Sequence, residues 1–302
     1  MMSDKKNIHL VSDSICCDYT NMKGFFPQAG WGQYISDYFN NDVKIVNHAL
    51  AGYSLKAFLY FKYPYTESLK SVWDADIYPT IQSNDYVIIS SDINDMGSIS
   101  NDYYSDFDGN IYKFIPDENK YMLFVNGKPT NNCYMGETEK LTKVFSFASK
   151  LDADGKTENC EYKSCIKKMI NEIRAKGAVP VLVSSPTEFL ENETGLYSEY
   201  SKYIDAMKET ALKEHITYID LHTEVKKLYT DLGNENARLK YNVNQHTIEY
   251  WQKKYNHNTF DCSKKACDNT HFCIGGAQML AKLLASLIKK SDSSLKEYIV
   301  NI

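Results

Sequence analysis

The stretch Ile8-His9-Leu10-Val11-Ser12-Asp13-Ser14 sets the architecture that we expect for this protein. Its apolar residues form a short, nearly continuous run, which is typical of a strand covered on both faces of a parallel sheet. Polar residues follow at once. Ser14 is therefore expected just beyond the carboxyl end of the first strand, where sheets of this kind build their sites.

Similar runs recur along the chain and alternate with helical patterns. The expected strands are Ile8–Ser12, Val43–Asn47, Tyr86–Ser90, Val179–Ser184 and Thr217–Leu221. The expected helices are Gly32–Phe39, Ser54–Phe61, Cys160–Lys176, Leu196–Glu214, Glu224–Leu232 and Gly276–Lys290. This alternation predicts a three-layer α/β/α fold with a five-stranded, mainly parallel sheet. We find no linker or repeat, so one domain is expected over residues 1–302.

The regular alternation stops at about residues 97–153, where an irregular insertion is expected. The segment Phe124-Val125-Asn126-Gly127-Lys128 within it contains an Asn-Gly pair, which favours a tight hairpin turn. A second aromatic and polar stretch, Tyr241 to Phe260, contains Trp251. Insertions at the carboxyl edge of a sheet often shape the neighbouring site. Trp251 is therefore a candidate contact to substrate.

Charge and hydropathy exclude some classes of partner. The formal net charge is −5 and the sequence pI is about 5.8, so a nucleic-acid partner has no electrostatic support. No apolar run has the length of a membrane span, and no membrane partner is expected. The chain reaches Ile8 without an apolar stretch of signal-peptide length. As written, a cytoplasmic location is expected, and secretion is the alternative if a leader has been removed.

The cysteine spacing does not indicate a metal site. The chain has eight cysteines, but paired Cys-x-x-Cys spacings and a His-x-x-x-His partner are both missing from the sequence. We expect no metal and no other cofactor, and we read the thiols as small buried hydrophobes. A disulfide among Cys262, Cys267 and Cys273 stays open as an alternative that would require export.

The two ends of the chain supply residues for acyl transfer, which needs a nucleophile, a base and a group that orients the base. Near the carboxyl end, Cys267-Asp268-Asn269-Thr270-His271-Phe272 places an Asp three residues ahead of a His. Ser14 is the expected nucleophile. His271 would take its proton, and Asp268 would hold the imidazole in the required tautomer.

Two further loops offer donors for a developing oxyanion. Gly52 follows the second strand and has no Cβ, so its backbone N–H can approach a reacting carbonyl closely. Asn94 follows the third strand and carries a side-chain amide. Together with the Ser14 N–H, these groups are the expected three-donor oxyanion hole.

These motifs, taken in order, resemble those of the SGNH (GDSL-type) hydrolase superfamily and, within it, the rhamnogalacturonan acetylesterase-like carbohydrate esterases. The similarity runs from about residue 8 to residue 290, apart from the insertion. Its motifs are Ser12-Asp13-Ser14 with Asp18-Tyr19, Gly30-Trp31-Gly32-Gln33, the Asn47–Phe58 segment, Asp92-Ile93-Asn94-Asp95 and the Asp268–Ala277 segment.

The resemblance implies a flavodoxin-like three-layer fold and a metal-independent serine esterase. By the same resemblance, the expected substrate is an acetylated plant polysaccharide or oligosaccharide of the pectin or rhamnogalacturonan type, from which the enzyme would remove O-acetyl groups. Ser14, Asp268 and His271 stand at the positions of the family's triad, and Gly52 and Asn94 stand at its oxyanion positions.

Three positions depart from the family pattern. Ser12 stands where the family prefers glycine. Tyr53 replaces an arginine that is common after the second-block glycine, and Asp92 replaces the third-block glycine. Tyr53 and Asp92 are therefore candidate substrate-binding residues. A carboxylate of Asp92 aimed at the oxyanion would oppose the developing negative charge.

Two other functions stay open at this point. A lipase or thioesterase of the same superfamily would act on longer acyl chains and would need an apolar channel. A carbohydrate-binding protein without turnover would retain the fold but carry a degraded oxyanion hole, a reading motivated by Ser12, Asp92 and Ile93.

Overall fold

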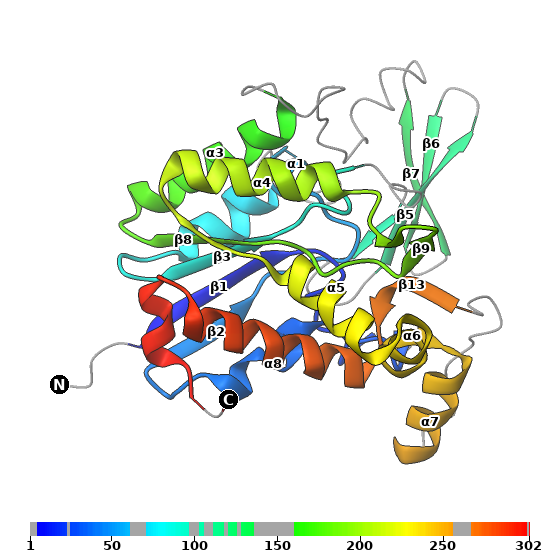
Figure 1. Ribbon diagram of the computed structural model, residues 1–302. Helices are drawn as coiled ribbons and strands as arrows, with labels where there is room; N and C mark the ends of the chain where they lie inside the picture. The colour runs from blue at the N-terminus through cyan, green and yellow to red at the C-terminus, as the bar shows by residue number, and fades with distance from the viewer. Residues whose placement is uncertain are drawn as a thin grey trace.

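The computed structural model describes residues 5–22, 25–60, 71–96, 103–105, 111–117, 120–125, 128–135, 160–255, 267–300 and 302. Five parallel strands form the central sheet in the order β11-β8-β3-β1-β2 (Figure 1). They are β1 (Lys6–Ser12), β2 (Val43–Asn47), β3 (Tyr86–Ser90), β8 (Val179–Val183) and β11 (Thr217–Ile219). The expected parallel sheet is confirmed, and each strand lies within two residues of the expected limits.

The sheet register aligns the ends of the strands that carry the candidate residues. Ser12 at the end of β1 pairs with Ser90 at the end of β3. On the other side of β1, Leu10 pairs with Asn47 at the end of β2. Because the three strands are parallel neighbours, the loops that follow them leave the sheet along one edge.

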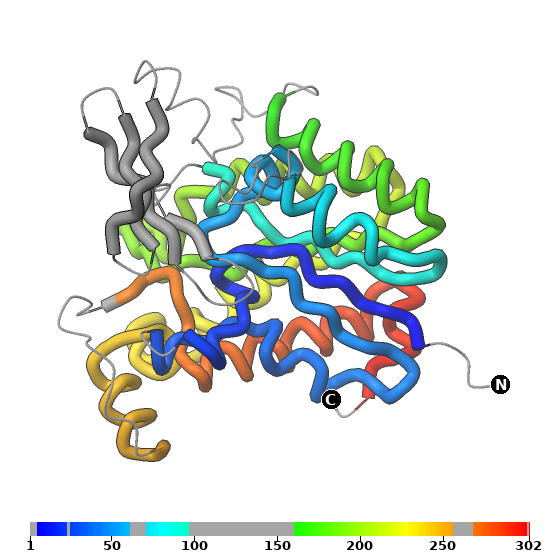
Figure 2. The backbone as a smooth tube through the Cα atoms, turned by 180° about the vertical axis from the view of Figure 1, so that it is seen from behind, coloured from blue at the N-terminus to red at the C-terminus, as the bar shows by residue number. Residues whose placement is uncertain are grey.

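Helices cover both faces of the sheet and produce the expected three layers. One apolar cluster joins the Val87 and Ile89 face to α1 (Leu55–Tyr60), α3 (Glu161–Ala175) and α4 (Ser201–Glu214). The opposite cluster contains Tyr86 and Ile88, with buried residues of α5 (Leu221–Leu232) and α8 (Ile274–Lys290). Figure 1 and the reverse view in Figure 2 show the sheet between these two helical layers. Alternate residues of β3 thus face opposite cores.

Local sequence explains where the main helices begin and end. The Asp220 carboxylate accepts a hydrogen bond from the Thr223 N–H at 2.9 Å and caps α5. Gly177 follows the last turn of α3 with a φ of +72°, a conformation that glycine adopts without steric cost. The last helix, α8, repeats buried residues at helical spacing: Ala277, Leu280, Ala281, Leu284, Ala285 and Ile288.

The insertion expected to be irregular contains regular structure, which corrects that expectation. The strands β4 (Tyr103–Ser105), β5 (Ile111–Asp117), β6 (Lys120–Val125) and β7 (Lys128–Met135) form a four-stranded antiparallel sheet in this order. Val125 pairs with Lys128, so the hairpin expected at the Asn-Gly pair is confirmed by the register of its flanking strands. The residues of the turn itself lie outside the described ranges.

Other differences arise where tertiary contacts override local pattern. The expected helix Gly32–Phe39 is two 3₁₀ turns, Trp31–Gln33 and Ile35–Tyr38. The expected helix from Leu196 begins only at Ser201, because β10 (Gly195–Tyr197) pairs with β9 (Leu190–Asn192) before it.

The aromatic and polar stretch after α5 is more regular than the sequence indicated. It forms α6 (Asn234–Tyr241), β12 (Asn242–Asn244) and α7 (Gln245–Tyr255). Strand β12 pairs antiparallel with β13 (Cys267–Phe272), which contains the Asp-His phrase. None of the helices in the described ranges is long and apolar enough to cross a membrane.

Candidate active site

Ser14 lies in a tight turn directly after β1 and is 6 % exposed. The backbone carbonyl of Asp13 accepts hydrogen bonds from the N–H groups of Cys16 and Cys17, both at 3.1 Å, and closes the turn. The Tyr19 hydroxyl donates to the Ser14 carbonyl at 3.0 Å. These bonds hold the serine at the carboxyl edge of the sheet, where sequence analysis placed it. The bond from Tyr19 was not anticipated, although the Asp18-Tyr19 pair belongs to the first motif.

His271 connects the serine to a carboxylate. Its Nε2 lies 3.0 Å from Ser14 Oγ, and its Nδ1 lies 2.9 Å from Asp268 Oδ2. The His271 side chain is 16 % exposed and that of Asp268 is 11 % exposed, so the base can be reached from solvent while its partner is more shielded. The structure therefore brings together the three residues expected to form the triad. In this arrangement the imidazole can accept a proton from the hydroxyl on one side and donate to the carboxylate on the other.

Backbone contacts fix the Asp268 carboxylate. Its Oδ1 accepts hydrogen bonds from the N–H groups of Thr270 at 2.9 Å and His271 at 2.8 Å. Oδ2 is thus turned toward the imidazole. The two residues lie in the strand β13 instead of a helical turn, and the bend that brings Oδ1 to these amides is an irregular part of that strand.

Three other segments hold β13 beside the serine turn. The Asn269 carbonyl accepts from the Phe189 N–H at 2.8 Å, and the Phe272 carbonyl accepts from the Ala29 N–H at 3.0 Å. The Tyr241 carbonyl at the end of α6 accepts from the Cys273 N–H at 2.8 Å. These contacts are distant in sequence from the phrase they support, and local pattern could not reveal them.

The expected oxyanion donors lie in loops that leave the same edge of the sheet. Gly52 has a φ of +82° in the loop after β2, and Asn94 is 7 % exposed in the loop after β3. The Asn94 side-chain amide donates one hydrogen bond to the Tyr53 carbonyl at 3.2 Å, which leaves its second N–H for another acceptor. Among the hydrogen bonds of the described residues, the backbone N–H groups of Ser14 and Gly52 are not used as donors. The two N–H groups are therefore available to donate hydrogen bonds to a ligand.

Asp92 does not bind substrate in this structure, which corrects the expectation. It has no exposed surface, and its Oδ2 accepts a hydrogen bond from the Ser185 N–H at 3.0 Å, in the loop after β8. The carboxyl is thus anchored to the neighbouring strand's loop. The buried position of the Asp92 carboxyl therefore argues against the hypothesis that Asp92 degrades the oxyanion hole.

Tyr53 is also a correction, because its side chain has no exposed surface. Its ring packs against Phe58 of α1 with centroids 5.0 Å apart. The position therefore belongs to the core in this structure and cannot contact substrate.

Trp251 lies on α7 and is 7 % exposed. It belongs to a small apolar cluster that includes Ile248, Cys273 and Ile274, and its ring stacks on Tyr255 with centroids 5.8 Å apart. No described contact joins it to the three triad residues. Its expected role in binding substrate stays a prediction.

Two buried carboxyls lie beneath the catalytic turn. Asp13 and Asp92 have no exposed surface, and Asp13 Oδ2 and Asp92 Oδ1 each have no hydrogen-bond partner. Burial, together with the nearby negative charge of Asp92, raises the pKa of Asp13 to about 8. Burial also raises the pKa of Asp92 to about 6. An interior that penalises charge in this way keeps Asp13 protonated at neutral pH.

The cysteines and the acidic groups can be described only in part. Cys273 is a buried free thiol, and so are Cys16, Cys17, Cys160 and Cys165. Cys262 and the Cys267 side chain lie outside the described part of the chain. In the ranges that the structure describes, no three His, Cys, Asp or Glu side chains are grouped so that they could hold a metal ion.

Comparison with known proteins adds a full-length similarity. None of the protein-family models matches the chain. The chain is 24 % identical to the probable rhamnogalacturonan acetylesterase YesY of Bacillus subtilis, over 97 % of each chain. It is also 24 % identical to the rhamnogalacturonan acetylesterase RhgT of the same organism, over 100 % of this chain and 97 % of the relative.

Among solved structures, the protein YXIM of Bacillus subtilis is similar in fold, with a TM-score of 0.57 and 19 % identity. The match covers 95 % of this chain but only 56 % of that protein. The chain is therefore similar over its full length to proteins named rhamnogalacturonan acetylesterase, and the expected resemblance to those esterases is confirmed.

Proposed function

We propose that this protein is a serine carboxylic ester hydrolase that removes O-acetyl groups from a carbohydrate. The observation that carries the proposal is the hydrogen-bonded series from Ser14 Oγ through His271 to Asp268, with distances of 3.0 and 2.9 Å. The names of the two full-length relatives supply the first candidate substrate, acetylated rhamnogalacturonan or oligosaccharides cut from it.

In the first half of the reaction, Ser14 Oγ attacks the acetyl carbonyl while its proton moves to His271 Nε2. Asp268 holds the ring through Nδ1 and stabilises the imidazolium that forms. When the tetrahedral intermediate collapses, the bond to the sugar oxygen breaks. That oxygen takes the proton from His271 and leaves as the free hydroxyl, and the acetyl group remains on Ser14.

Negative charge on the former carbonyl oxygen needs donors. We assign this role to the backbone N–H groups of Ser14 and Gly52 and to the Asn94 amide, which lie at one edge of the sheet. A single donor of this kind typically contributes roughly 3 to 4 kcal/mol to transition-state stabilisation.

The second half returns the enzyme to its starting state. His271 accepts a proton from water as the water oxygen attacks the acetyl-serine. Collapse of the second tetrahedral intermediate breaks the bond to Ser14 Oγ, which regains its proton from His271, and acetic acid is released. No step requires a further reactant besides water.

The two alternatives are not favoured. The comparisons return acetylesterases over the full length of the chain, which does not support a lipase or thioesterase. A binding protein without turnover has no need of a serine, an imidazole and a carboxylate in hydrogen-bonded order. The burial of Asp92 against Ser185 also removes the principal reason for that reading.

The proposal is tested by hydrolysis of p-nitrophenyl acetate, butyrate and octanoate. Wild-type protein should prefer acetate, and Ser14→Ala should abolish turnover on every chain length. Ser12→Ala is the matched control, because it removes a buried hydroxyl that donates to the Ser90 carbonyl in the same segment. It should retain measurable turnover.

Acetate release from acetylated rhamnogalacturonan and acetylated xylan then identifies the polymer. Preference for octanoate would instead support the lipase reading. Turnover that survives Ser14→Ala would overturn the assignment of the nucleophile.

A further inference from the structure

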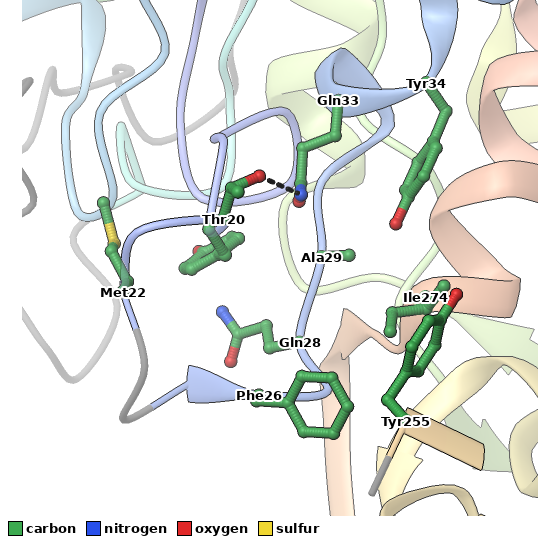
Figure 3. Close-up of a pocket in the computed structure, with 10 residues that line it drawn as sticks. Thr20, Met22, Phe26, Gln28, Ala29, Gln33, Tyr34, Tyr255 and Ile274 are labelled. Carbon is green, nitrogen blue, oxygen red and sulfur yellow. Dashed lines mark hydrogen bonds between the residues drawn. The ribbon is translucent and has the colours of Figure 1, made fainter. Parts of the chain in front are cut away.

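A pocket of about 270 Å³ lies beside the segment that follows the serine turn. Its wall consists of Tyr19, Thr20, Met22, Phe26, Gln28, Ala29, Gln33, Tyr34, Tyr255 and Ile274 (Figure 3). Ligand pockets for drug-sized molecules measure roughly 300 to 1,000 Å³. The volume therefore suits one sugar ring better than a longer oligosaccharide.

The Gln28 side chain is part of the wall of this pocket. Gln28 is only 5 % exposed, yet its side chain makes no hydrogen bond within the described part of the chain. Figure 3 shows the amide extending into the space bounded by Thr20, Met22 and Phe26. An amide that faces the pocket offers two donors and an acceptor to a ligand.

Aromatic rings form much of the remaining wall. Phe26 and Tyr255 meet edge to face, with centroids 6.2 Å apart and planes at 90°. The hydroxyl end of Tyr34 extends toward the side of the pocket where Tyr255 and Ile274 lie (Figure 3). Aromatic faces combined with hydroxyl and amide groups match the surface of a sugar, which has apolar faces and a rim of hydroxyls.

The charges around the pocket favour a neutral occupant. None of the described residues that line it is a lysine, arginine or histidine. Burial raises the pKa of Tyr34 to about 12, so that hydroxyl is neutral at ordinary pH. The Asp18 carboxylate lies just outside and accepts from the Thr20 hydroxyl at 2.6 Å. Lys254 Nζ lies 4.6 Å from the centroid of the Trp251 ring and 6.0 Å from that of Tyr255, which is part of the wall.

The pocket wall is continuous with both halves of the candidate active site. Tyr19 lines the pocket and donates its hydroxyl to the Ser14 carbonyl at 3.0 Å. Ile274 lines it three residues after His271, and its N–H donates to the Pro27 carbonyl at 3.0 Å. A molecule bound here would thus lie against the same loops that hold the nucleophile and the base.

We propose that this pocket is a second carbohydrate subsite that binds one neutral sugar ring through Gln28, Phe26, Tyr34 and Tyr255. As a subsite it binds a non-reacting part of the substrate and improves the capture of oligosaccharides over small esters. The binding itself does not depend on ester hydrolysis. Only its effect on turnover rests on the proposed function.

Binding is measured on the full chain carrying Ser14→Ala, by titration with the methyl glycosides of rhamnose, galactose and xylose. Galacturonic acid serves as the charged comparison. We expect saturable binding of at least one neutral glycoside and weaker binding of galacturonic acid. Tyr255→Ala should weaken that binding about tenfold, which corresponds to about 1.4 kcal/mol. Gln28→Ala should do the same through the lost hydrogen bonds.

Tyr250→Ala is the matched control. Tyr250 and Tyr255 both lie on α7 and are 54 % and 55 % exposed, but Tyr250 lines a different pocket. Both variants are expected to fold, because each removes a largely exposed ring. Tyr250→Ala should leave the affinity unchanged. The proposal is overturned if no neutral glycoside binds, if Tyr250→Ala weakens binding as much as Tyr255→Ala, or if galacturonic acid binds more tightly.

The kinetic readout separates this subsite from the catalytic proposal. Tyr255→Ala in the active enzyme should lower kcat/KM about tenfold for an acetylated oligosaccharide and leave p-nitrophenyl acetate hydrolysis unchanged. Loss of activity on both substrates would contradict a remote subsite. If wild-type protein hydrolyses neither, the esterase proposal fails, and the glycoside titrations still decide the subsite.

Discussion

At the scale of single residues, the candidate site depends on the different hydrogen bonds that the two oxygens of one carboxylate make. Asp268 Oδ1 accepts from two backbone N–H groups, and Oδ2 faces His271 Nδ1 at 2.9 Å. The backbone bonds prevent the carboxylate from rotating. They therefore select the imidazole tautomer that carries a proton on Nδ1 and leaves Nε2 free to accept from Ser14.

Asp268→Asn tests the separate roles of the two carboxylate oxygens. The Asn oxygen can keep the two backbone bonds, and its NH₂ group would then face Nδ1 and impose the wrong tautomer. We expect kcat on p-nitrophenyl acetate to fall by roughly 10⁴-fold with little change in stability. Asp220→Asn is the control, because asparagine caps a helix as well as aspartate does. A kcat for Asp268→Asn within tenfold of wild type would exclude the assigned role.

At the scale of secondary-structure elements, the junction between β13 and α8 positions the base. Gly276 lies in the first turn of α8, and a Cβ added there would lie 2.3 Å from the Tyr241 carbonyl oxygen. That carbonyl accepts from the Cys273 N–H, two residues beyond His271. Close packing of the helix start on the end of α6 thus requires glycine at this position.

Gly276→Ala should therefore shift the β13–α8 junction. We expect a loss of about 1 to 3 kcal/mol in the free energy of unfolding, together with a lower kcat. The adjacent Gly275→Ala is the control, since its Cβ would lie 3.3 Å from the Trp251 ring and 3.9 Å from Cys273 Sγ, without a contact to the backbone. Alanine also favours the helix by roughly 1 kcal/mol over glycine. Urea unfolding and turnover of both variants check this, and equal effects would show that the Tyr241 contact is unimportant.

At the scale of the whole molecule, the core encloses titratable groups whose charged forms are disfavoured by burial. His9 Nδ1 lies 2.9 Å from His48 Nε2, and its Nε2 lies 3.2 Å from Asp85 Oδ2, so these side chains link β1 to the residue after β2 and the residue before β3. Burial lowers the pKa of His48 to about 3, and it raises the pKa of Asp13 to about 8. The two groups should make stability depend on pH in opposite directions.

For His48, the unfolded chain binds a proton near pH 6.5 and the folded chain does not, so stability is lost as the pH falls below that value. For Asp13, the folded chain keeps its proton after the unfolded chain has lost it, so stability is lost as the pH rises from 3.8 toward about 8. Each contributes about 1.4 kcal/mol per pH unit at most.

Relative to wild type, Asp13→Asn should gain stability between about pH 4 and about pH 8 and change little above it. His48→Gln should gain stability only as the pH falls below about 6.5. Urea unfolding of the three proteins across this range checks both signs. Parallel curves for a variant and wild type would mean that the group in question has the same pKa in the folded and unfolded chains.

Local patterns in the sequence were enough to predict the five central strands, the type of fold, and Ser14, Asp268 and His271 as the candidate triad. These features are local: a buried strand is a short apolar run, and each motif occupies a few consecutive residues. Gly52 and Asn94 were identified for the same reason, because each directly follows a strand. The regular strands within the insertion were missed, since polar and aromatic residues there showed no clear period.

The contacts between distant segments became visible only in the three-dimensional structure. It placed His271 3.0 Å from Ser14, although the two are 257 positions apart. It turned Asp92 toward Ser185, buried Tyr53, and assembled a pocket from segments around Gln28, Ile274 and Tyr255. Side-chain direction and burial depend on contacts between distant segments, whose pairing is chosen by packing of the whole core. No local pattern contains that information.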